Sequence, residues 1–336
     1  MSFVQKIRKI IEKKFSFIQE KKLLLAVSGG KDSMAMAFAL AELRDYFGFE
    51  LSALHVNHNL RAESVDEALF VLTELGKIGI PCVLKEIPLD FWNDDANMEN
   101  RARDERYGLI KECFEVQHSD YLLTAHHQDD QVETLLMRIF DRGSGIRGLC
   151  GILPENDMLD MPILRILLDI SRMEIEKYME NKLFVEDSSN NDTKILRNYF
   201  RRDVVPALDS LLNKDWRSNI LRLSENAFSE TVFSKHAALF FWDSLSYSDS
   251  ESKCWYISRI VIAKYPDEFW LTAFSYLFSA ERGFSFSRKT LEDILKFIKK
   301  HDPGISSYSP FVFERDTKGV LILKKGFVEF KINSAR

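Results

Sequence analysis

The chain has 336 residues, 46% of them hydrophobic, and a formal net charge of −5. This length exceeds that of one compact core of the commonest size, so we expect two or three domains, and the apolar content excludes long disordered stretches. The acidic balance excludes a uniformly basic surface, and four widely spaced cysteines without a C-x-x-C pair favour neither a zinc site nor a disulfide framework.

The N-terminal segment predicts an amphipathic helix rather than a targeting signal. Val4, Ile7, Ile11 and Phe15 repeat at helical spacing, and basic residues are mixed with glutamates around them. No apolar run elsewhere approaches the roughly 20 residues that are needed to cross a bilayer. We therefore expect a soluble, cytoplasmic protein without a membrane partner.

Short apolar runs alternate with helical patterns through the first half of the chain. The expected strands are residues 23–27, 51–56, 83–87 and 121–125, and the expected helices are residues 34–43, 63–78, 100–114 and 134–140. This alternation predicts an α/β fold with a doubly wound parallel sheet that is covered by helices on both faces. In such sheets, ligands bind at the carboxyl ends of the strands.

A different pattern follows the glycine-rich connector at residues 143–151. Ser171 and Glu174 have the spacing of a capping box, which predicts that a helix begins there. A polar, turn-forming stretch at residues 187–192 then precedes a long helical segment that Pro206 should break.

The last third of the chain predicts a smaller, mainly helical C-terminal domain. From about residue 220 the β-α alternation ends, and the composition shifts to Phe, Trp and Ser. We expect a late helix at residues 289–300 and a β-hairpin formed by residues 310–315 and 320–325. The predicted domains are residues 1–215 and 216–336.

Residues 28–33 (SGGKDS) join the first expected strand directly to the first expected helix. The two glycines let the backbone turn sharply and approach a ligand, and the amides at the helix start favour an anion. A Walker loop would need glycine where Leu25 stands and Ser or Thr where Asp32 stands, and a Rossmann fingerprint would need three spaced glycines. The segment therefore predicts a phosphate-binding loop of another class.

A second polar cluster, residues 124–134 (TAHHQDDQVET), follows the fourth expected strand and should lie at the same edge of the sheet. Asp130 and Glu133 are three residues apart on the expected helix, and Asp129 and Glu133 are four apart, so their carboxylates share a face and need a cation. The alternative is that the aspartates only answer the helix dipole and that the two histidines only pack.

The SGGKDS segment resembles the loop of PP-loop ATP pyrophosphatases at every fixed position. Enzymes of this class cleave ATP between the α and β phosphates and place AMP on an oxygen of the substrate. The resemblance implies ATP and Mg²⁺ as cofactors, with the phosphates bound by Ser28, Gly29, Gly30, Lys31, Asp32 and Ser33. Asp32 would lie near the Mg²⁺ ion, because hard cations prefer carboxylate and phosphate oxygens.

Several ordered motifs are together similar to those of the tRNA(Ile)-lysidine synthetase family. They are SGGKDS at 28–33, HVNHNLR at 55–61, AHHQDDQVET at 125–134, RGSGIRG at 142–148 and EDSSN at 186–190, with Arg197, Asn198 and Arg201 after them. The resemblance implies a fold of the adenine nucleotide alpha hydrolase type and a homodimer. It also implies three substrates: ATP, free L-lysine, and the wobble cytidine of a tRNA(Ile) with a CAU anticodon.

The resemblance also implies roles for individual residues. The expected catalytic residues are Asp32, His127, Asp130 and Glu133, and the expected metal ligands are Asp32 and Asp130. Basic residues outnumber acidic ones between residues 194 and 222, which favours RNA binding, although a solvated helix face would look similar. The expected tRNA-binding residues in this stretch are Arg197, Arg201 and Arg202.

Three rival functions share parts of this pattern. A tRNA-thiolating PP-loop enzyme usually relies on paired cysteines, and none are suitably spaced here. An amide-forming PP-loop ligase would need an ammonia source, and we expect no glutaminase segment before the loop. A non-catalytic RNA-binding module with a relic loop would not need Asp32, Asp130 and Glu133 together.

Overall fold

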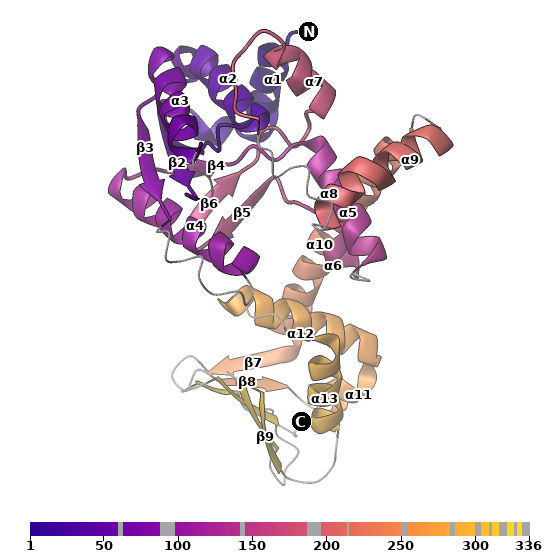
Figure 1. Cartoon of the computed structure of the whole chain (residues 1–336). Helices are drawn as coiled ribbons and strands as arrows, with labels where there is room; N and C mark the ends of the chain where they lie inside the picture. The colour runs from indigo at the N-terminus through magenta and orange to yellow at the C-terminus, as the bar shows by residue number, and fades with distance from the viewer. Residues whose placement is uncertain are drawn as a thin grey trace. The chain divides into compact units, whose positions relative to one another are not determined.

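The computed structural model of the chain describes residues 1–59, 63–87, 98–141, 145–186, 196–213, 215–249, 254–257, 259–282, 286–299, 304–308, 311–315, 321–325 and 328–330. The chain forms two compact units, Met1–Glu225 and Asn226–Arg336 (Figure 1). The sequence prediction divides the chain after residue 215, and the division in the structure falls inside the next helix, α10 (Trp216–Leu245).

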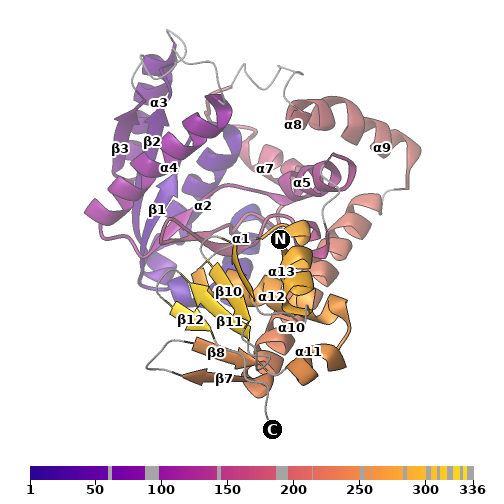
Figure 2. The same ribbon diagram turned by 90° about the horizontal axis from the view of Figure 1, so that it is seen from below.

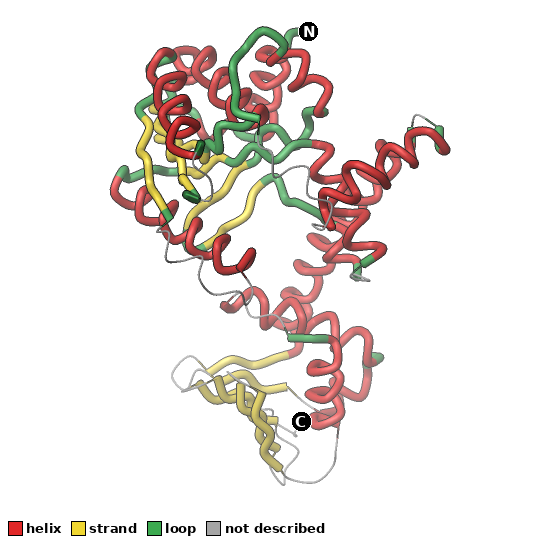
Figure 3. Tube along the Cα trace, in the orientation of Figure 1, coloured by secondary structure: helices red, strands yellow, loops and turns green. Residues whose placement is uncertain are grey.

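A six-stranded sheet forms the centre of the first unit, with the strand order β3-β2-β1-β4-β6-β5 (Figure 3). The strands are β1 (Lys22–Ala26), β2 (Glu50–Asn57), β3 (Cys82–Glu86), β4 (Tyr121–Leu123), β5 (Glu155–Met158) and β6 (Met161–Leu164). Neighbouring strands are parallel except β5, which is antiparallel to β6. The predicted doubly wound sheet is therefore confirmed, and the β5–β6 hairpin is an addition that the sequence pattern did not predict.

Helices cover both faces of this sheet (Figure 1). Leu23 and Leu25 of β1 belong to one core cluster, to which α1 (Phe3–Lys14), α2 (Lys31–Phe47), α3 (Ser64–Lys77) and α7 (Arg172–Met179) also contribute. Leu24 belongs to a second cluster with Tyr107 and Ile110 of α4 (Met98–Val116). Because successive strand residues point to opposite faces, β1 is apolar throughout and both of its faces are buried.

Local capping signals set the ends of the helices beside the sheet. Ser171 and Glu174 form the predicted capping box at the start of α7. Gly48, with φ of 70°, ends α2, and its amide donates to the carbonyl of Arg44. Ile7 and Ile11 of the predicted amphipathic helix α1 are fully buried, as their spacing predicts.

A further group of helices follows β4 in the first unit. These elements are α5 (Gln128–Phe140), α6 (Ile146–Leu149), α8 (Leu196–Tyr199), a π-helical turn η4 (Phe200–Val204), α9 (Val205–Leu211) and the start of α10. Val132 of α5 packs against Phe200 and Trp216 in a small separate core. The expected break at Pro206 is wrong: the backbone stays helical at Val204 and Val205, and the proline is tolerated because it occupies the first turn of α9, after the π-helical turn η4.

The second unit contains the predicted helices and more strands than the sequence pattern indicates. Its described helices include α11 (Arg259–Lys264), α12 (Asp267–Arg282) and α13 (Arg288–Lys299), and β7 (Ser246–Asp249) pairs with β8 (Cys254–Ile257). A four-stranded antiparallel sheet has the order β12-β11-β10-β9 (Figure 2). Its strands are β9 (Gly304–Tyr308), β10 (Phe311–Arg315), β11 (Leu321–Lys325) and β12 (Val328–Phe330). Strands β10 and β11 are the predicted hairpin, which is confirmed.

None of the helices in the described part of the chain combines the length and the apolar character that a membrane crossing requires.

Leu25→Ala should lower the free energy of unfolding by about 2–5 kcal/mol, because it removes a fully buried side chain from the central strand. Leu69→Ala is the matched control, since Leu69 on α3 is 62% exposed; we expect a change within about 0.5 kcal/mol. Urea unfolding followed by circular dichroism measures both. Equal losses for the two variants would contradict the assigned core.

Candidate functional site

The loop at residues 28–33 joins β1 to α2 and requires glycine at its turn. Gly29 has φ of +88°, and a Cβ there would lie 2.7 Å from a methyl group of Val71 and 3.2 Å from one of Val185. The Ser28 amide donates to Ser33 Oγ at 3.2 Å, and Ser33 Oγ donates to the Gly30 carbonyl at 3.0 Å. The serine hydroxyls therefore hold the loop in shape.

A residue far along the chain fixes the orientation of the Gly29–Gly30 peptide. The Val185 amide donates to the Gly29 carbonyl at 2.9 Å. In a trans peptide the carbonyl and the following N–H point in opposite directions, so this bond turns the Gly30 N–H away from Val185. That N–H donates to Ser28 Oγ at 3.3 Å. Sequence reasoning missed Val185, although the family-like motif at residues 186–190 begins directly after it.

Lys31 faces the segment that carries Val185. Its ammonium lies 3.5 Å from the Glu176 carboxylate and 5.1 Å from the centre of the Phe184 ring. Lys31 therefore connects the loop to α7 and to the chain that follows it.

His127 connects the loop to the acidic helix. It is the N-cap of α5 and only 2% exposed; its amide donates to Asp130 Oδ2 at 2.9 Å, and its Nδ1 accepts from the Asp129 amide at 3.2 Å. Its Nε2 lies 3.6 Å from Asp32 and 3.5 Å from Asp130. Burial alone would lower the pKa of His127, but its contact with the Asp32 carboxylate and the charges of Asp130, Asp32 and Asp129 outweigh burial and raise it.

Arg197 and Arg201 neutralise the buried carboxylates of α5. Asp130 is 8% exposed and Glu133 is 3% exposed. Arg197 contacts Asp130 at 2.7 Å and Glu133 at 3.0 Å, and Arg201 contacts Glu133 at 2.6 Å and Asp130 at 3.2 Å. Burial raises the pKa of Asp130, but His127 and Arg197 outweigh it, so the pKa of Asp130 lies below its usual value. The structure thus brings two predicted tRNA-binding residues onto two predicted catalytic residues.

Arg202, the third predicted tRNA-binding residue, is exposed on the same turn η4. His55 of the HVNHNLR motif is buried, and its Nδ1 lies 2.8 Å from the Val27 carbonyl, so it joins β2 to the end of β1. Parts of the family-like motifs, residues 60–61, 142–144 and 187–190, lie outside the described residues, as does Lys194.

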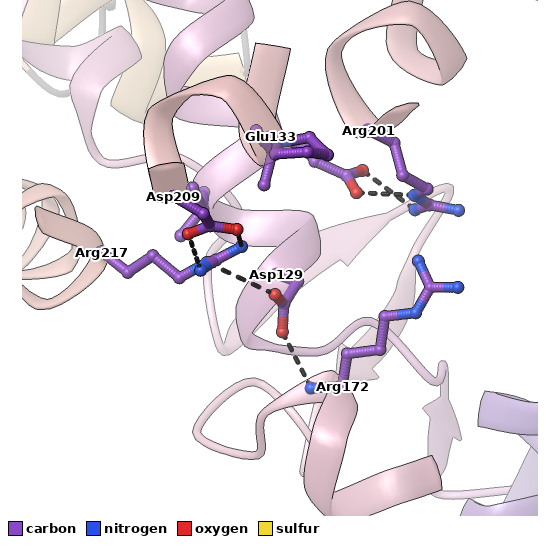
Figure 4. Close-up of a pocket in the computed structure, with 9 residues that line it drawn as sticks. Asp129, Glu133, Arg172, Arg201, Asp209 and Arg217 are labelled. Carbon is purple, nitrogen blue, oxygen red and sulfur yellow. Dashed lines mark hydrogen bonds and ion pairs between the residues drawn. The ribbon is translucent and has the colours of Figure 1, made fainter. Parts of the chain in front are cut away.

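A pocket of about 150 Å³ lies beside the buried carboxylates (Figure 4). Three acidic and three basic residues line it: Asp129, Glu133, Asp209, Arg172, Arg201 and Arg217. Arg217 pairs with both carboxylate oxygens of Asp209, and Asp129 accepts from the Arg172 amide at 2.8 Å. Figure 4 shows the Arg172 side chain extending from α7 toward the side on which Arg201 lies.

The pocket also has an apolar wall, formed by Val132, Val205 and Pro206. A cavity with paired opposite charges and an apolar wall suits a zwitterion with an aliphatic stem rather than a simple anion. Sequence reasoning missed Arg172, because a single arginine at the start of a capped helix carries no signal of its own.

Gln131 fixes the connector after α5. Its side-chain amide donates to the Cys150 carbonyl at 3.2 Å and to Ser224 Oγ at 2.9 Å. Gly151 has φ of +66°, and a Cβ there would lie 2.4 Å from the Gln131 amide oxygen. The glycine-rich connector is therefore required for close packing against α5.

Comparisons with known proteins agree with this geometry. A family model described as the PP-loop domain matches residues 1–208. The chain is 39% identical over 208 residues to the tRNA(Ile)-lysidine synthase of Treponema denticola, in an alignment that covers 59% of this chain and 44% of that protein. It is 33% identical over 231 residues to the tRNA(Ile)-lysidine synthase of Petrotoga mobilis, in an alignment that covers 68% of this chain and 72% of that protein.

The chain spans about half the length of some curated relatives, with 44% of the protein from Treponema denticola and 53% of the one from Thermosipho africanus aligned. Among solved structures, the U34-tRNA thiolase NcsA from Methanococcus maripaludis, with its 4Fe-4S cluster, aligns with a TM-score of 0.55 at 18% identity. That alignment covers 66% of this chain and 78% of the thiolase, and it shows a shared fold. From the extent of the family match and of the alignment with the Petrotoga protein, the chain belongs to the PP-loop family and, within it, to the tRNA(Ile)-lysidine synthase family.

Proposed function

We propose that this chain uses ATP to adenylate the wobble cytidine of a tRNA(Ile) with a CAU anticodon and then joins L-lysine to C2 of that base. The observation that carries the proposal is the contact between Asp32 of the loop and His127, which also holds Asp130. A nucleotide loop and a buried acidic pair thereby meet at one edge of the sheet. The names of the curated relatives supply the substrate class.

The loop has the donors that a triphosphate needs. The amides at the start of α2 and the hydroxyls of Ser28 and Ser33 face an anion at the positive end of a helix of 17 residues. The Val185 amide supports this role, because it sets the direction in which the Gly30 N–H points. Residues 28–33 are therefore assigned to ATP.

The residues present fit Mg²⁺ through Asp32 better than through Asp130. The Asp32 side chain is 43% exposed, and a carboxylate with substrate phosphates and water is the usual magnesium environment in nucleotide sites. Both oxygens of Asp130 are already engaged by His127, Arg197 and Arg201, so a metal there would have to replace an arginine. Bound Mg²⁺ would neutralise phosphate charge and polarise the α-phosphate.

Adenylation turns the cytosine O2, which is a poor leaving group, into part of a good leaving group, AMP. The cytosine O2 attacks the α-phosphorus of ATP; the new O–P bond forms as the bond to the β-phosphate oxygen breaks, and pyrophosphate leaves. The ε-amine of lysine then attacks C2, the C2–O2 bond breaks, and AMP leaves with that oxygen. The amine must first lose a proton, because its unperturbed pKa is about 10.4. Buried carboxylates beside the pocket are suited to orient this amine.

The zwitterionic pocket is assigned to free lysine. The Arg172 guanidinium is half exposed, and its Nε lies 3.1 Å from Glu176, its one ion pair among the described residues, so it suits the α-carboxylate. Asp129 suits the α-ammonium, and Val132 and Val205 line the path of the methylene stem. The ε-ammonium would then reach Glu133 by replacing one of its arginine contacts.

An arginine that the lysine ammonium displaces from Glu133 could pair with an RNA phosphate instead. Arg197, Arg201 and Arg202 are assigned to the tRNA backbone, since a guanidinium binds phosphate as readily as carboxylate. From the family we also predict that the second unit binds tRNA, that the chain forms a homodimer and that the protein is cytoplasmic.

Incubation with ATP, labelled lysine and tRNA(Ile), followed by nucleoside analysis, tests the function. We expect lysidine, and pyrophosphate release that depends on both lysine and tRNA. Asp32→Ala should abolish pyrophosphate release and leave tRNA affinity within about twofold. Asp45→Ala is the control, because Asp45 is a fully exposed aspartate on the same helix. Unchanged ATP turnover in Asp32→Ala would reject its role.

Val185→Pro should raise the KM for ATP by roughly tenfold, because proline lacks the N–H that orients the Gly29–Gly30 peptide. Val185→Ala keeps that N–H and should stay within about twofold of the wild type. Steady-state pyrophosphate release against ATP concentration measures both variants. An equal rise in KM for the two would show that the side chain, not the amide, matters.

Arg172→Gln should raise the KM for lysine by about tenfold or more and leave the KM for ATP unchanged, because it removes a charged partner of the α-carboxylate. Lys177→Gln, an exposed charge on the same helix, is the matched control. The same assay at varied lysine concentration gives the comparison. A lysine KM that does not move in Arg172→Gln would place lysine elsewhere.

A further inference from the structure

A second cluster of arginines lies outside both the phosphate loop and the pocket. Arg103 and Arg106 are near the start of α4, and Arg165 comes directly after β6. A helix that connects parallel strands runs back against them, so its first turns and the end of β6 lie at the edge where the strands finish. The cluster is therefore at the ligand-binding edge, on the face of the sheet that α4 covers.

Tyr107 holds the two arginines of α4. The guanidinium carbon of Arg103 lies 5.2 Å from the centre of the Tyr107 ring, and that of Arg106 lies 5.6 Å from it. Tyr107 is 5% exposed and packs in the core beneath α4. A buried ring thus fixes two cations side by side.

Arg165 adds a third cation, which is more than nine-tenths buried. It is 8% exposed, and its Nη1 donates to the Leu153 carbonyl at 2.7 Å and to Asn156 Oδ1 at 2.5 Å. Its Nε is buried and makes no hydrogen bond in the described part of the chain. A buried guanidinium with an unsatisfied donor favours a further partner, and the described residues do not supply one.

The part of the chain that the structure describes supplies no carboxylate countercharge to the three arginines. Among the described residues, none of them forms an ion pair with a carboxylate. Burial lowers the pKa of Arg106 and of Arg165, and the charge of Arg103 lowers both further. Two cations on one buried ring, and a third that is close enough for the charge of Arg103 to act on it, favour an anionic ligand.

His126 shows that this cluster adjoins the proposed active site. Burial lowers the pKa of His126 to about 4, and the charges of Arg165, Arg197 and Arg103 act in the same direction. The next residue, His127, lies 3.6 Å from Asp32 of the phosphate loop. Of two successive residues that follow β4, one is within range of the charges of these arginines and the other contacts the nucleotide loop.

We propose that Arg103, Arg106 and Arg165 bind a backbone phosphodiester of the RNA substrate next to the modified cytidine. This inference rests on the proposed function, which requires the base to reach the α-phosphate of ATP at the loop. The backbone phosphate of that nucleotide must then lie no farther from the loop than the length of one nucleoside. A planar guanidinium binds phosphate oxygens with paired hydrogen bonds. ATP already has its own donors at the start of α2, across the sheet from α4.

Salt-dependent tRNA binding by the full chain, without ATP, tests the site. Arg103→Gln and Arg106→Gln should each weaken affinity for tRNA(Ile) by roughly tenfold at moderate salt and reduce the slope of log affinity against log salt by about 0.7. Arg103→Lys keeps the charge and should restore most of the slope. Lys111→Gln removes a charge from the same helix, further from the sheet edge, and should keep the wild-type slope.

The KM for ATP is measured for the same variants. A raised KM for ATP with an unchanged tRNA slope would assign the arginines to the nucleotide and overturn the proposal. Slopes equal to that of Lys111→Gln would overturn it as well. Lysine incorporation by the wild type is measured separately. If the wild type binds tRNA without forming lysidine, the proposed reaction is wrong, but the slopes of log affinity against log salt still decide whether the arginines bind phosphate. A wild type that binds no tRNA overturns both.

Discussion

The burial of two carboxylates on one face of α5 is the constraint on which the rest of the site depends. Asp130 and Glu133 are so little exposed that burying their charges is costly without a cation beside them. Arg197 and Arg201 supply those cations from α8 and η4. These ion pairs hold α8 and η4 against α5. His127 in turn connects Asp130 to Asp32 of the phosphate loop.

The same constraint makes the substrates interdependent in the proposed reaction. The carboxylates that suit the lysine ammonium are held by the arginines that suit RNA phosphates, so each ligand competes with a contact inside the protein. Breaking one side of a buried ion pair is costly unless a new partner replaces it at once. In the proposed complex, RNA phosphates would pair with the arginines, and the lysine ammonium would pair with the carboxylates. When both ligands are bound, no buried charge is therefore left without a partner.

Sequence patterns predicted the parts of the molecule in which local chemistry decides structure. The apolar run Leu23–Val27 and the loop after it gave the central strand and the glycine turn, since both faces of β1 are buried and Gly29 has a positive φ. The spacing of Asp130 and Glu133 predicted a shared face and the need for a cation. It did not predict the identity of that cation, because Arg197 lies 67 residues from Asp130 in sequence.

The contacts that sequence reasoning missed all depend on tertiary placement. Val185 acts through its backbone amide, which any residue except proline supplies, so its side chain carries no signal. The β5–β6 hairpin has the sequence Glu-Asn-Asp-Met in its first strand, without the alternation that marks a half-buried strand. Arg165 follows an ordinary buried strand, and only the fold brings it near Arg103 on α4.

The arrangement of charge around the end of β4 unites the site. On one side, His127 faces Asp32 and the loop that would hold an anionic triphosphate; on the other, His126 is within range of the charges of Arg103 and Arg165, which form no ion pair with a carboxylate among the described residues. A nucleotide substrate carries its reactive base and its negative backbone on opposite sides of a ribose. A sheet edge with a phosphate loop on one face and the cluster of Arg103, Arg106 and Arg165 on the other can therefore fix both ends of that nucleotide, which the proposed transfer of AMP to one chosen oxygen demands.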